Sequence, residues 1–445
     1  MLDRLRRFSS HPLESLHYRM MKAVHKIIPA ASRVSINTAS INSTEAEAAA
    51  DAIERTERGN YIGTVHALEN NYFLSNEEHA HCIRLVERIQ KLYDESLDYI
   101  DRNGLDRALF LAGNEWAGLI QNSGLRFRTT YNDINYLRLT GPLFSGYHLT
   151  ILDRFDVRRF PEPWDEAFVK TLEMNGIPTD IAEITRKLYN PEARLRPCVV
   201  EYLNHIRNVP QRFIVRTPRI FGEVGIEING VLTNPDVVLC QSRINGMLCS
   251  GVIAKIDADI ARKGYARVLE VGPGHGGLAY ALKTIFEDRL EYICIDLPTS
   301  LYHSTLYLST LSADSGCYVL LPNEPVPNHF KFLFIANYMI EEVAASLGPI
   351  DLALNTMSFP EMSAEQIHYY GELFKRLIGS DGIVFEENGV VRPWHVDIKE
   401  IFSRIFPYRK HVSSDIVTTK NWCQDIWSNN YIGSIHNCSD TMLLR

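Results

Sequence analysis

The chain has 445 residues, which exceeds the usual size of a single core, so we expect two domains or one domain with a large extension. Hydrophobic residues make up 45% and charged residues 22%, as in an ordinary folded protein, and the formal charge of -8 with a pI near 6.0 lacks the basic footprint of a nucleic-acid binder. The eight cysteines show no CxxC pair and no metal-ligand spacing, which predicts reduced thiols in a cytoplasmic protein, without zinc and without disulfides.

The N-terminal segment is basic and amphipathic. Its cationic residues are Arg4, Arg6, Arg7, Arg19, Lys22 and Lys26. No apolar run approaches the roughly 18 residues that span a bilayer, and the uninterrupted apolar core of a signal peptide is missing, so we predict no integral membrane segment. We interpret the segment as a solvated arm or as a contact in a homo-oligomer. A helix lying on a membrane surface is the alternative.

Up to about residue 210 the pattern is typical of a mostly helical region. Thr44 with Glu47, and Ser75 with Glu78, have the spacing of a capping box, in which the two side chains satisfy backbone N–H groups at a helix N-terminus. Residues 127–149 differ from the rest because they are rich in Tyr, Asn, Arg and Gly and lack helical periodicity. Such a loop suits recognition of a sugar or another polyol, and a plain structural connection is the alternative.

Residues 211–264 are predicted to form a connecting unit. Alternating apolar residues indicate a small hairpin that turns at Asn229 and Gly230. A helix over 236–263 follows, with Asn234 as its N-cap. Three polar residues of this helix are second-rank candidates for cofactor or substrate contacts: Gln241, Arg243 and Asn245.

The stretch 268–282 is organised as a short apolar strand, a glycine turn and a helix. Gly272, Gly274 and Gly276 permit positive φ and a close approach of a ligand to the backbone. A second apolar strand ends in Asp296, where a carboxylate can accept both hydroxyls of a ribose at the carboxyl edge of the sheet. We therefore expect a nucleoside-containing cofactor at this turn.

The spacing of the glycines discriminates between two cofactor classes. Dinucleotide folds place the third glycine three positions after the second, to seat a pyrophosphate, whereas the three glycines here alternate. Glu270 lies two positions before the first of them, and its carboxylate suits a cation rather than a diphosphate. The pattern acid-x-Gly-x-Gly-x-Gly resembles motif I of the class I S-adenosylmethionine (SAM)-dependent methyltransferases. A nicotinamide oxidoreductase is the weakest alternative.

This resemblance implies a fold and a set of cofactor-binding residues. The fold is α/β, with a doubly wound Rossmann-like methyltransferase sheet over 265–445 and a mostly helical N-terminal region over 1–210. The cofactor is SAM. Its predicted binding residues are Glu270, Gly272, Gly274, Gly276, Asp296, Leu297 and Asn355.

The third and fourth strands follow Asp296. Residues 317–321 and 330–337 both qualify as the third strand, and we favour the second because a helix then leads to the next strand in βαβ rhythm. The fourth strand, 350–354, opens into the loop NTMSFPEMS. The glycine turn, the IDLP stretch and this loop together resemble a family of bacterial sugar O-methyltransferases, over roughly 222–394. The resemblance implies methyl transfer to a hydroxyl of a sugar or glycoconjugate.

A base must remove the hydroxyl proton as the methyl bond forms. Glu361 is the first candidate because its loop faces the expected methyl group; His275 and His303 come next, followed by His368 and His395. A divalent ion held by Glu361, Glu386 and Glu387 is the alternative. The fourth strand ends in Asn355 instead of a carboxylate, so we predict no metal.

The residues after Arg392 are predicted to form the last helix and strands of the sheet. We expect a SAM-dependent O-methyltransferase that transfers the methyl group by an in-line displacement while a general base removes the hydroxyl proton. The region 1–210 is expected to shape acceptor specificity. The predicted partner is a small-molecule or glycoconjugate acceptor, with a second copy of the chain in a possible homo-oligomer. We predict no nucleic-acid partner and no integral membrane segment. The alternatives are methylation of another small molecule or of a protein, and a non-catalytic interaction protein with this fold.

Overall fold

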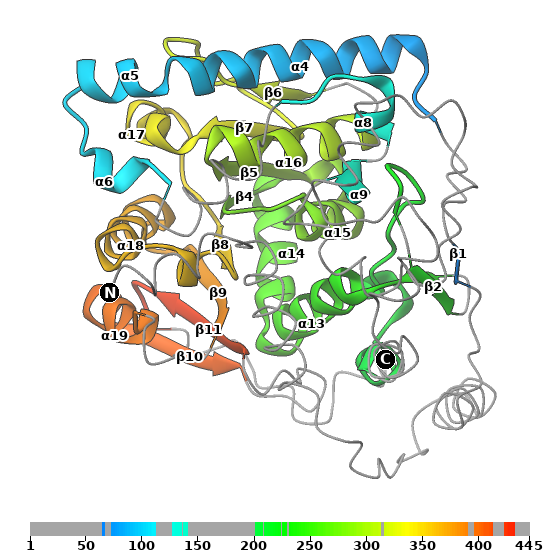
Figure 1. Ribbon diagram of the computed structural model, residues 1–445. Coiled ribbons are helices and arrows are strands. Elements are labelled where there is room, and N and C mark those ends of the chain that lie inside the picture. Colours follow the sequence, from blue (N-terminus) through cyan, green and yellow to red (C-terminus); the bar gives the residue numbers. More distant parts are fainter. Residues whose placement is uncertain are drawn as a thin grey trace, which may run out of the picture.

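The computed structural model describes most of the C-terminal half of the chain and parts of the N-terminal half (Figure 1). The described residues are 65–66, 73–112, 127–135, 137–140, 201–207, 209–223, 225–228, 231–312, 316–389, 396–412 and 422–431. Several predictions fall outside them: the basic N-terminal segment, the Thr44 capping box, the hairpin turn at 229–230 and His395. Of the predicted loop 127–149, residues 136 and 141–149 also lie outside them, while its described part contains two short helices, over 131–135 and 137–140, where a loop was expected.

An eight-stranded sheet forms the centre of the described part of the chain, in the order β10-β11-β9-β8-β4-β5-β7-β6. Its strands are β4 (Ala266–Val271), β5 (Leu290–Asp296), β6 (Cys317–Val319), β7 (Phe332–Ala336), β8 (Leu352–Thr356), β9 (Ile383–Gly389), β10 (Tyr408–Val412) and β11 (Trp422–Ser428). The six neighbouring strands β9, β8, β4, β5, β7 and β6 pair in parallel. Strand β11 runs antiparallel to β9 and to β10. The predicted third strand is β7, next to β5, and the rival segment also forms a strand, β6, at the edge.

The order of the strands makes the sheet doubly wound. From β4 the chain moves outward through β5 to β6 and β7, and it then returns to the other side of β4 to form β8 and β9. The direction of winding therefore reverses between β4 and β8, and ligands bind outside the carboxyl ends of the strands at such a point. The predicted Rossmann-like fold class is confirmed.

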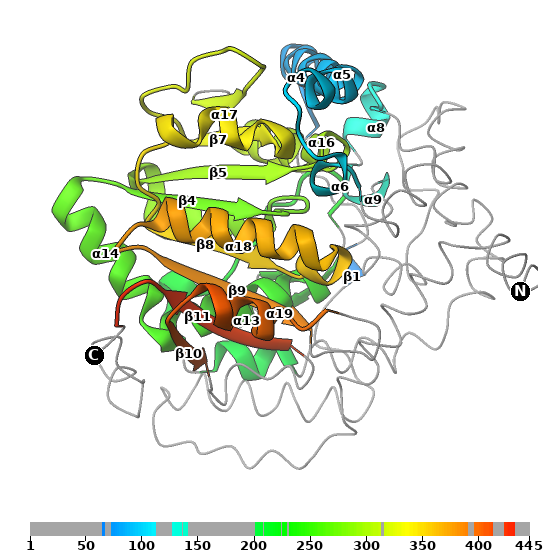
Figure 2. The same cartoon turned by 90° about the vertical axis from the view of Figure 1, so that its left-hand side faces the viewer.

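Helices cover both faces of this sheet (Figure 2). Figure 2 shows α18 (Ala364–Ile378) and α19 (Ile398–Ile405) on one face, with α13 (Pro235–Ser250) and α14 (Val252–Lys263) on the opposite face. The predicted helix over 236–263 is in fact this pair, because Gly251 adopts φ +86° and ends the first helix. Among the described residues no single helix is long and apolar enough to cross a bilayer, and α13 with α14 meets that criterion only as a pair bent by 71°.

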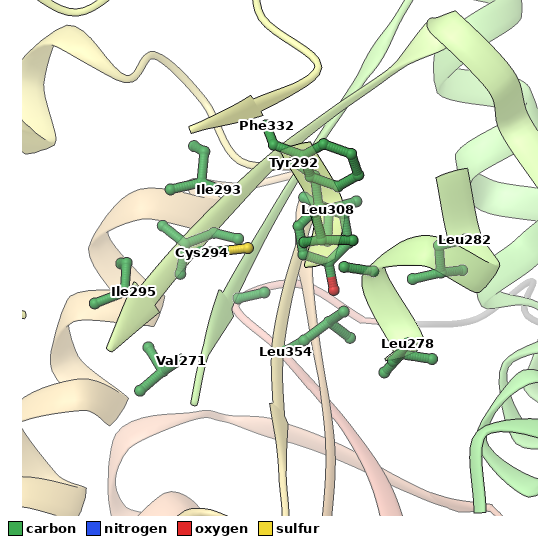
Figure 3. Close-up of a cluster of buried hydrophobic side chains, with 14 of the residues drawn as sticks. Val271, Leu278, Leu282, Tyr292, Ile293, Cys294, Ile295, Leu308, Phe332 and Leu354 are labelled. Carbon is green, nitrogen blue, oxygen red and sulfur yellow. The ribbon is translucent and has the colours of Figure 1, made fainter. Parts of the chain in front are cut away.

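The main core lies between the central strands and α15 (Gly277–Phe286) and α16 (Pro298–Leu311). Figure 3 shows Leu278 and Leu282 of α15 directed toward side chains of β4 and β5, with Leu308 of α16 beside them. These three leucines are 3%, 1% and 0% exposed. Burial of each such side chain contributes roughly 1.5–3 kcal/mol, so this packing fixes the helix that follows the glycine turn.

The described helices of the N-terminal region pack at more than one place, one of them on the edge strand β6 and another on α18. They are α4 (Asn76–Asp94), α5 (Ser96–Arg102), α6 (Arg107–Phe110), α8 (Tyr131–Asn135) and α9 (Leu137–Thr140). The Ser75–Glu78 capping box opens α4 as predicted, and Arg88 of α4 donates to the carbonyl oxygen of Val319 in edge strand β6 at 3.0 Å. Figure 1 shows α4 along the top of the molecule, above β6 and α16, and α4 packs against α16. The division of the chain into three units stays a prediction.

Three short strands that precede α13 form a separate small sheet. Strand β1 (Val65–His66) pairs with β2 (Gly225–Ile228), which pairs with β3 (Val231–Thr233), each antiparallel. The predicted hairpin is therefore present as β2 and β3. Between β7 and β8 the chain forms α17 (Ile340–Val343).

Candidate active site

The glycine turn connects β4 to α15 in a conformation that suits glycine. Gly272, Gly274 and Gly276 have φ values of +76°, +61° and +93°. The N–H of Gly272 donates to the carbonyl oxygen of Ile295 at 2.9 Å, which ties the turn to the end of β5. A β-carbon on Gly272 would lie 2.4 Å from Oγ of Ser358. The turn therefore needs glycine both for its backbone angle and for its packing.

A cavity of about 200 Å³ opens beside this turn, at the carboxyl ends of β4, β5 and β8. Its wall is formed by Leu111, Ala112, Asp236, Leu239, Cys240, Arg243, Glu270, Val271, Gly272, Pro273, Gly274, His275, Gly277, Leu278, Asp296, Leu297, Asn337, Thr356, Met357, Ser358, Glu361, Met362, Gln366 and Tyr370. The cavity thus lies at the edge where the winding of the sheet predicts a ligand.

Most of the predicted site residues meet at this cavity. Glu270, Gly272, Gly274, Asp296 and Leu297 line it, as do the base candidates His275 and Glu361. Two predicted cofactor residues are absent from its wall. Gly276 packs against Leu308 of α16, and Asn355 points into the protein, where its Nδ2 donates to the carbonyl oxygen of Val271 at 3.0 Å and to Oγ of Ser358.

Glu270 lies on β4 at the floor of the cavity and is 1% exposed. The hydroxyl of Tyr292 on β5 donates to its Oε2 at 2.7 Å. Burial raises the pKa of Glu270 to about 7, although Tyr292, Arg243 and Thr356 oppose the rise. The carboxyl group therefore changes its charge near neutral pH and can respond to a cation placed beside it.

Asp296 ends β5 and is the second acid at the floor. Its Oδ1 accepts from the backbone N–H of Leu297 at 2.8 Å. Burial raises the pKa of Asp296 to about 8, and the nearby carboxyl groups of Glu361 and Glu270 contribute to the rise. The two acids and Glu361 consequently share one electrostatic environment.

His303 lies apart from the other catalytic candidates. It is 5% exposed within α16, outside the wall of the cavity, with its ring edge-on to Tyr302 at 5.0 Å between centroids. Burial lowers the pKa of His303 to about 3, and the charges of Arg138 and Arg128 lower it further. The structure therefore does not bring this histidine together with the glycine turn.

Of the second-rank candidates on α13, Arg243 alone lines the cavity. Its Nε donates to Oε1 of Glu387 on β9 at 2.8 Å. Gln241 instead binds backbone groups of Phe213 and Val215, and Asn245 donates to the carbonyl oxygen of His205. Gln241 and Asn245 therefore hold the segment before β2 against the helix.

The loop after β8 supplies contacts that the sequence did not reveal. Thr356, Met357 and Ser358 line the cavity. Met357 has φ +67°, a rare value for a residue with a side chain, and its N–H donates to the carbonyl oxygen of Glu387 at 2.8 Å. The loop is thus fastened both to β9 and, through Ser358, to the glycine turn.

The N-terminal region also reaches the cavity. Leu111 and Ala112, directly after α6, form part of its wall. Nε2 of Gln366 on α18 donates to the carbonyl oxygens of Leu109 and Leu111, and Asn337 donates to that of Phe110. No local motif could have predicted these contacts, since more than 200 residues separate the partners.

Two of the three acids proposed for a divalent ion, Glu386 and Glu387, have separate partners. Glu387 pairs with Arg243, whereas Glu386 accepts from Nδ2 of Asn388 at 2.7 Å. Neither lines the cavity that contains Glu361. Within the described ranges no group of three His, Cys, Asp or Glu residues has the geometry to hold a metal ion.

Comparisons with known proteins give distant structural neighbours. No protein-family model and no curated protein sequence matches the chain. Among solved structures, the bifunctional kinase-methyltransferase WbdD is similar with a TM-score of 0.28 and 19% identity, over 40% of this chain and 38% of the WbdD chain. An O-methyltransferase family protein from Burkholderia thailandensis is similar with a TM-score of 0.28 and 11% identity, over 44% of this chain and 60% of that one. Both neighbours are methyltransferases, but they are too distant to transfer an activity.

Proposed function

We propose that the chain is a SAM-dependent O-methyltransferase whose active site is the cavity at the glycine turn. The observation that carries this proposal is that two acids line one cavity, Glu270 near the carboxyl end of β4 and Asp296 at that of β5. The same cavity is lined by a turn that excludes a β-carbon at Gly272. Two acidic groups repel a diphosphate, but they suit a ligand with a positive charge and a ribose diol. SAM has both features.

The residues present fit the cofactor in their chemistry. Asp296 would accept the ribose hydroxyls, Glu270 would face the positively charged methionine end, and Gly272 and Gly274 would bring the backbone close to the ligand. SAM supplies a methyl group activated by a sulfonium. The work left for the protein is to orient the acceptor, to exclude water and to remove one proton.

Glu361 is the proposed general base, with His275 as the second candidate. Both residues line the cavity, whereas His303 and the exposed His368 do not. Glu361 contributes to the raised pKa of Asp296, so it lies near the acid that we assign to the ribose. This proximity supports a role for Glu361 in removing the proton of the acceptor hydroxyl.

The proposed acceptor is a hydroxyl of a sugar or glycoconjugate. The loop NTMSFPEMS and the IDLP stretch support this assignment through their resemblance to sugar O-methyltransferases. Leu111 and Ala112 of the N-terminal region line the cavity, which supports a role of that region in acceptor choice.

The test is turnover of SAM in the presence of simple sugars. Purified protein would be incubated with SAM and neutral methyl glycosides, and release of S-adenosylhomocysteine (SAH) would be measured with and without each glycoside. We expect glycoside-dependent release of SAH and a methylated sugar by mass spectrometry. Tight binding of NADH together with no binding of SAH would contradict the proposal and favour an oxidoreductase.

A further inference from the structure

Acidic side chains outnumber basic ones on the wall of the cavity. Among the described residues that line it, four have carboxyl groups, Asp236, Glu270, Asp296 and Glu361, and one has a guanidinium group, Arg243. That guanidinium is paired with Glu387. Glu270 and Asp296 are assigned to the cofactor and Glu361 to the base, which leaves Asp236 without a role in the proposed reaction.

Asp236 is held in place by a buried network that joins the N-terminal region to α13. Arg138 of α9 contacts Oδ2 of Asp236 at 2.5 Å and Oε2 of Glu223 at 2.7 Å. Nδ2 of Asn234, the N-cap of α13, donates to Oε1 of the same Glu223 at 2.6 Å. The side chains of Arg138 and Glu223 are 1% exposed, whereas that of Asp236 is 13% exposed. The carboxylate at the end of the network is therefore the part that reaches the cavity.

The same carboxylate also borders a small side pocket. This pocket has a volume of about 10 Å³, close to the space of one water molecule, and it shares Asp236, Cys240, His275 and Gly277 with the main cavity. Tyr280 and Tyr307 also line it, together with the charged residues Arg138, Arg216 and Glu223. This end of the cavity is thus polar and small, and it suits hydroxyl groups better than an apolar substituent.

We propose that Asp236 is a specificity-determining residue that accepts a hydrogen bond from the methyl acceptor, and that the site selects acceptors without a negative charge. This inference rests on the proposed function. A carboxylate fixed by a buried arginine can accept from sugar hydroxyls at no cost of reorganisation. A phosphate or uronate on the acceptor would instead lie beside the carboxylate of Asp236, and Arg243 on the cavity wall is already paired with Glu387, so desolvated like charges repel.

The test offers neutral and acidic acceptors in competition. The protein would be incubated with SAM tritiated on the methyl group and with equal concentrations of neutral oligosaccharides and of uronic-acid oligosaccharides, and the products would be separated by anion exchange. We expect at least about tenfold more label in the unretained neutral fraction. Label mainly in the retained acidic fraction would overturn the inference, whereas no label in either fraction, with SAH still bound, would contradict the proposed function itself.

Variants of Asp236 test the residue. Asp236→Asn should lower labelling of the neutral fraction about tenfold or more while the Kd for SAH changes less than about twofold. The matched control is Asp257→Asn on α14, which removes a carboxylate that is paired with Arg212 and whose side chain is 41% exposed, and it should change neither quantity. Equal labelling by Asp236→Asn, or a loss of SAH affinity as large as the loss of labelling, would overturn the assignment.

A second variant covers the case in which Asp236→Asn unfolds. Asp236→Glu keeps the charge beside Arg138 and moves the carboxylate by one methylene, so it should melt within a few degrees of the wild type. We expect it to retain the preference for neutral acceptors and to lower kcat/KM for them about tenfold. Unchanged kcat/KM in this folded variant would also overturn the assignment.

Discussion

Ser358 packs directly against Gly272, although 86 residues separate them in the sequence: a β-carbon built on Gly272 would lie 2.4 Å from the Ser358 hydroxyl oxygen. That hydroxyl also donates to the carbonyl oxygen of Val271 at 3.2 Å and accepts from Asn355. The glycine turn and the loop after β8 therefore form one rigid floor. The proposed cofactor and acceptor residues are held on this floor.

Gly272→Ala should damage binding more than stability. The added methyl group must displace Ser358, and a non-glycine residue at φ +76° is strained by roughly 1–2 kcal/mol. We expect the Kd for SAH to rise at least about tenfold, measured by calorimetry. Gly264→Ala is the control, because Gly264 has φ +87° but no atom within 4 Å of an added β-carbon. Gly264→Ala should lose only the stability that the strained backbone costs and should keep its affinity, and equal losses of affinity in both variants would contradict the account.

Binding of SAM should strengthen as the pH rises from 6 to 9. The pKa values of Glu270 and Asp296 are raised to about 7 and about 8, so both acids are largely protonated at pH 6. A cationic ligand favours their ionised forms, and binding must then release protons. We expect at least about tenfold tighter binding at pH 9 than at pH 6, together with proton release that is detectable by calorimetry in buffers of different ionisation enthalpy.

The same shifts predict how the ligand-free protein responds to pH. Glu270 and Asp296 have higher pKa values in the folded protein than in the unfolded chain, so the folded state favours their protonated forms. Their contribution to stability is fully present below about pH 4 and is lost as the pH rises through 7 to 8. Glu386, with a pKa raised to about 8, acts in the same direction but lies outside the cavity. The increase in Tm produced by SAM therefore isolates the site, and it should grow with pH. An increase in Tm that is independent of pH would count against Glu270 and Asp296 as ligands of a cation.

Arg138→Met should strongly lower the free energy of unfolding, because Arg138 is buried and paired. It removes the guanidinium that Glu223 and Asp236 share, and breaking a buried ion pair costs roughly 3–5 kcal/mol. Urea unfolding measures the loss directly. Arg107→Met removes an exposed pair with Asp101 and should leave the midpoint nearly unchanged. A small effect of Arg138→Met would mean that the network does not fix the N-terminal region to α13.

Glu361→Gln distinguishes the proposed base from its rival. We expect kcat to fall about 10²–10⁴-fold while the Kd for SAH stays within about twofold, because a base acts on the acceptor. His275→Asn should have the smaller effect, and His368→Asn, on the exposed side of α18, should have none. The reverse order of Glu361 and His275 would transfer the role of base to the histidine.

Local chemistry made part of this architecture predictable. The glycine turn, the acid at the end of β5 and the Ser75 capping box are each encoded within a few residues, so their positions followed from the sequence. The break of the predicted long helix at Gly251 had a local signal, a glycine in the helix interior, but a single glycine does not decide between a C-cap and a tolerated position.

Contacts between distant segments could not be predicted in this way. The side chain of Asn355 follows the fourth strand, as expected of a ligand contact, yet it points inward because the carbonyl oxygen of Val271 on the neighbouring strand lies within reach. The pairing of Arg138 with Asp236 depends on how α9 meets α13, and the approach of Leu111 to the cavity depends on Gln366. Such pairs exist only once the chain has folded.

The most direct test of the central claim is calorimetric titration of SAH into the wild-type protein and into Asp296→Ala. We predict that SAH binds the wild type with one site and that Asp296→Ala weakens binding at least about tenfold, since it removes the proposed acceptor of the ribose hydroxyls. Asp288→Ala, with a carboxylate that is 81% exposed before β5, should bind as the wild type does. No binding by the wild type, or equal binding by Asp296→Ala, would contradict a SAM site at the carboxyl ends of β4 and β5.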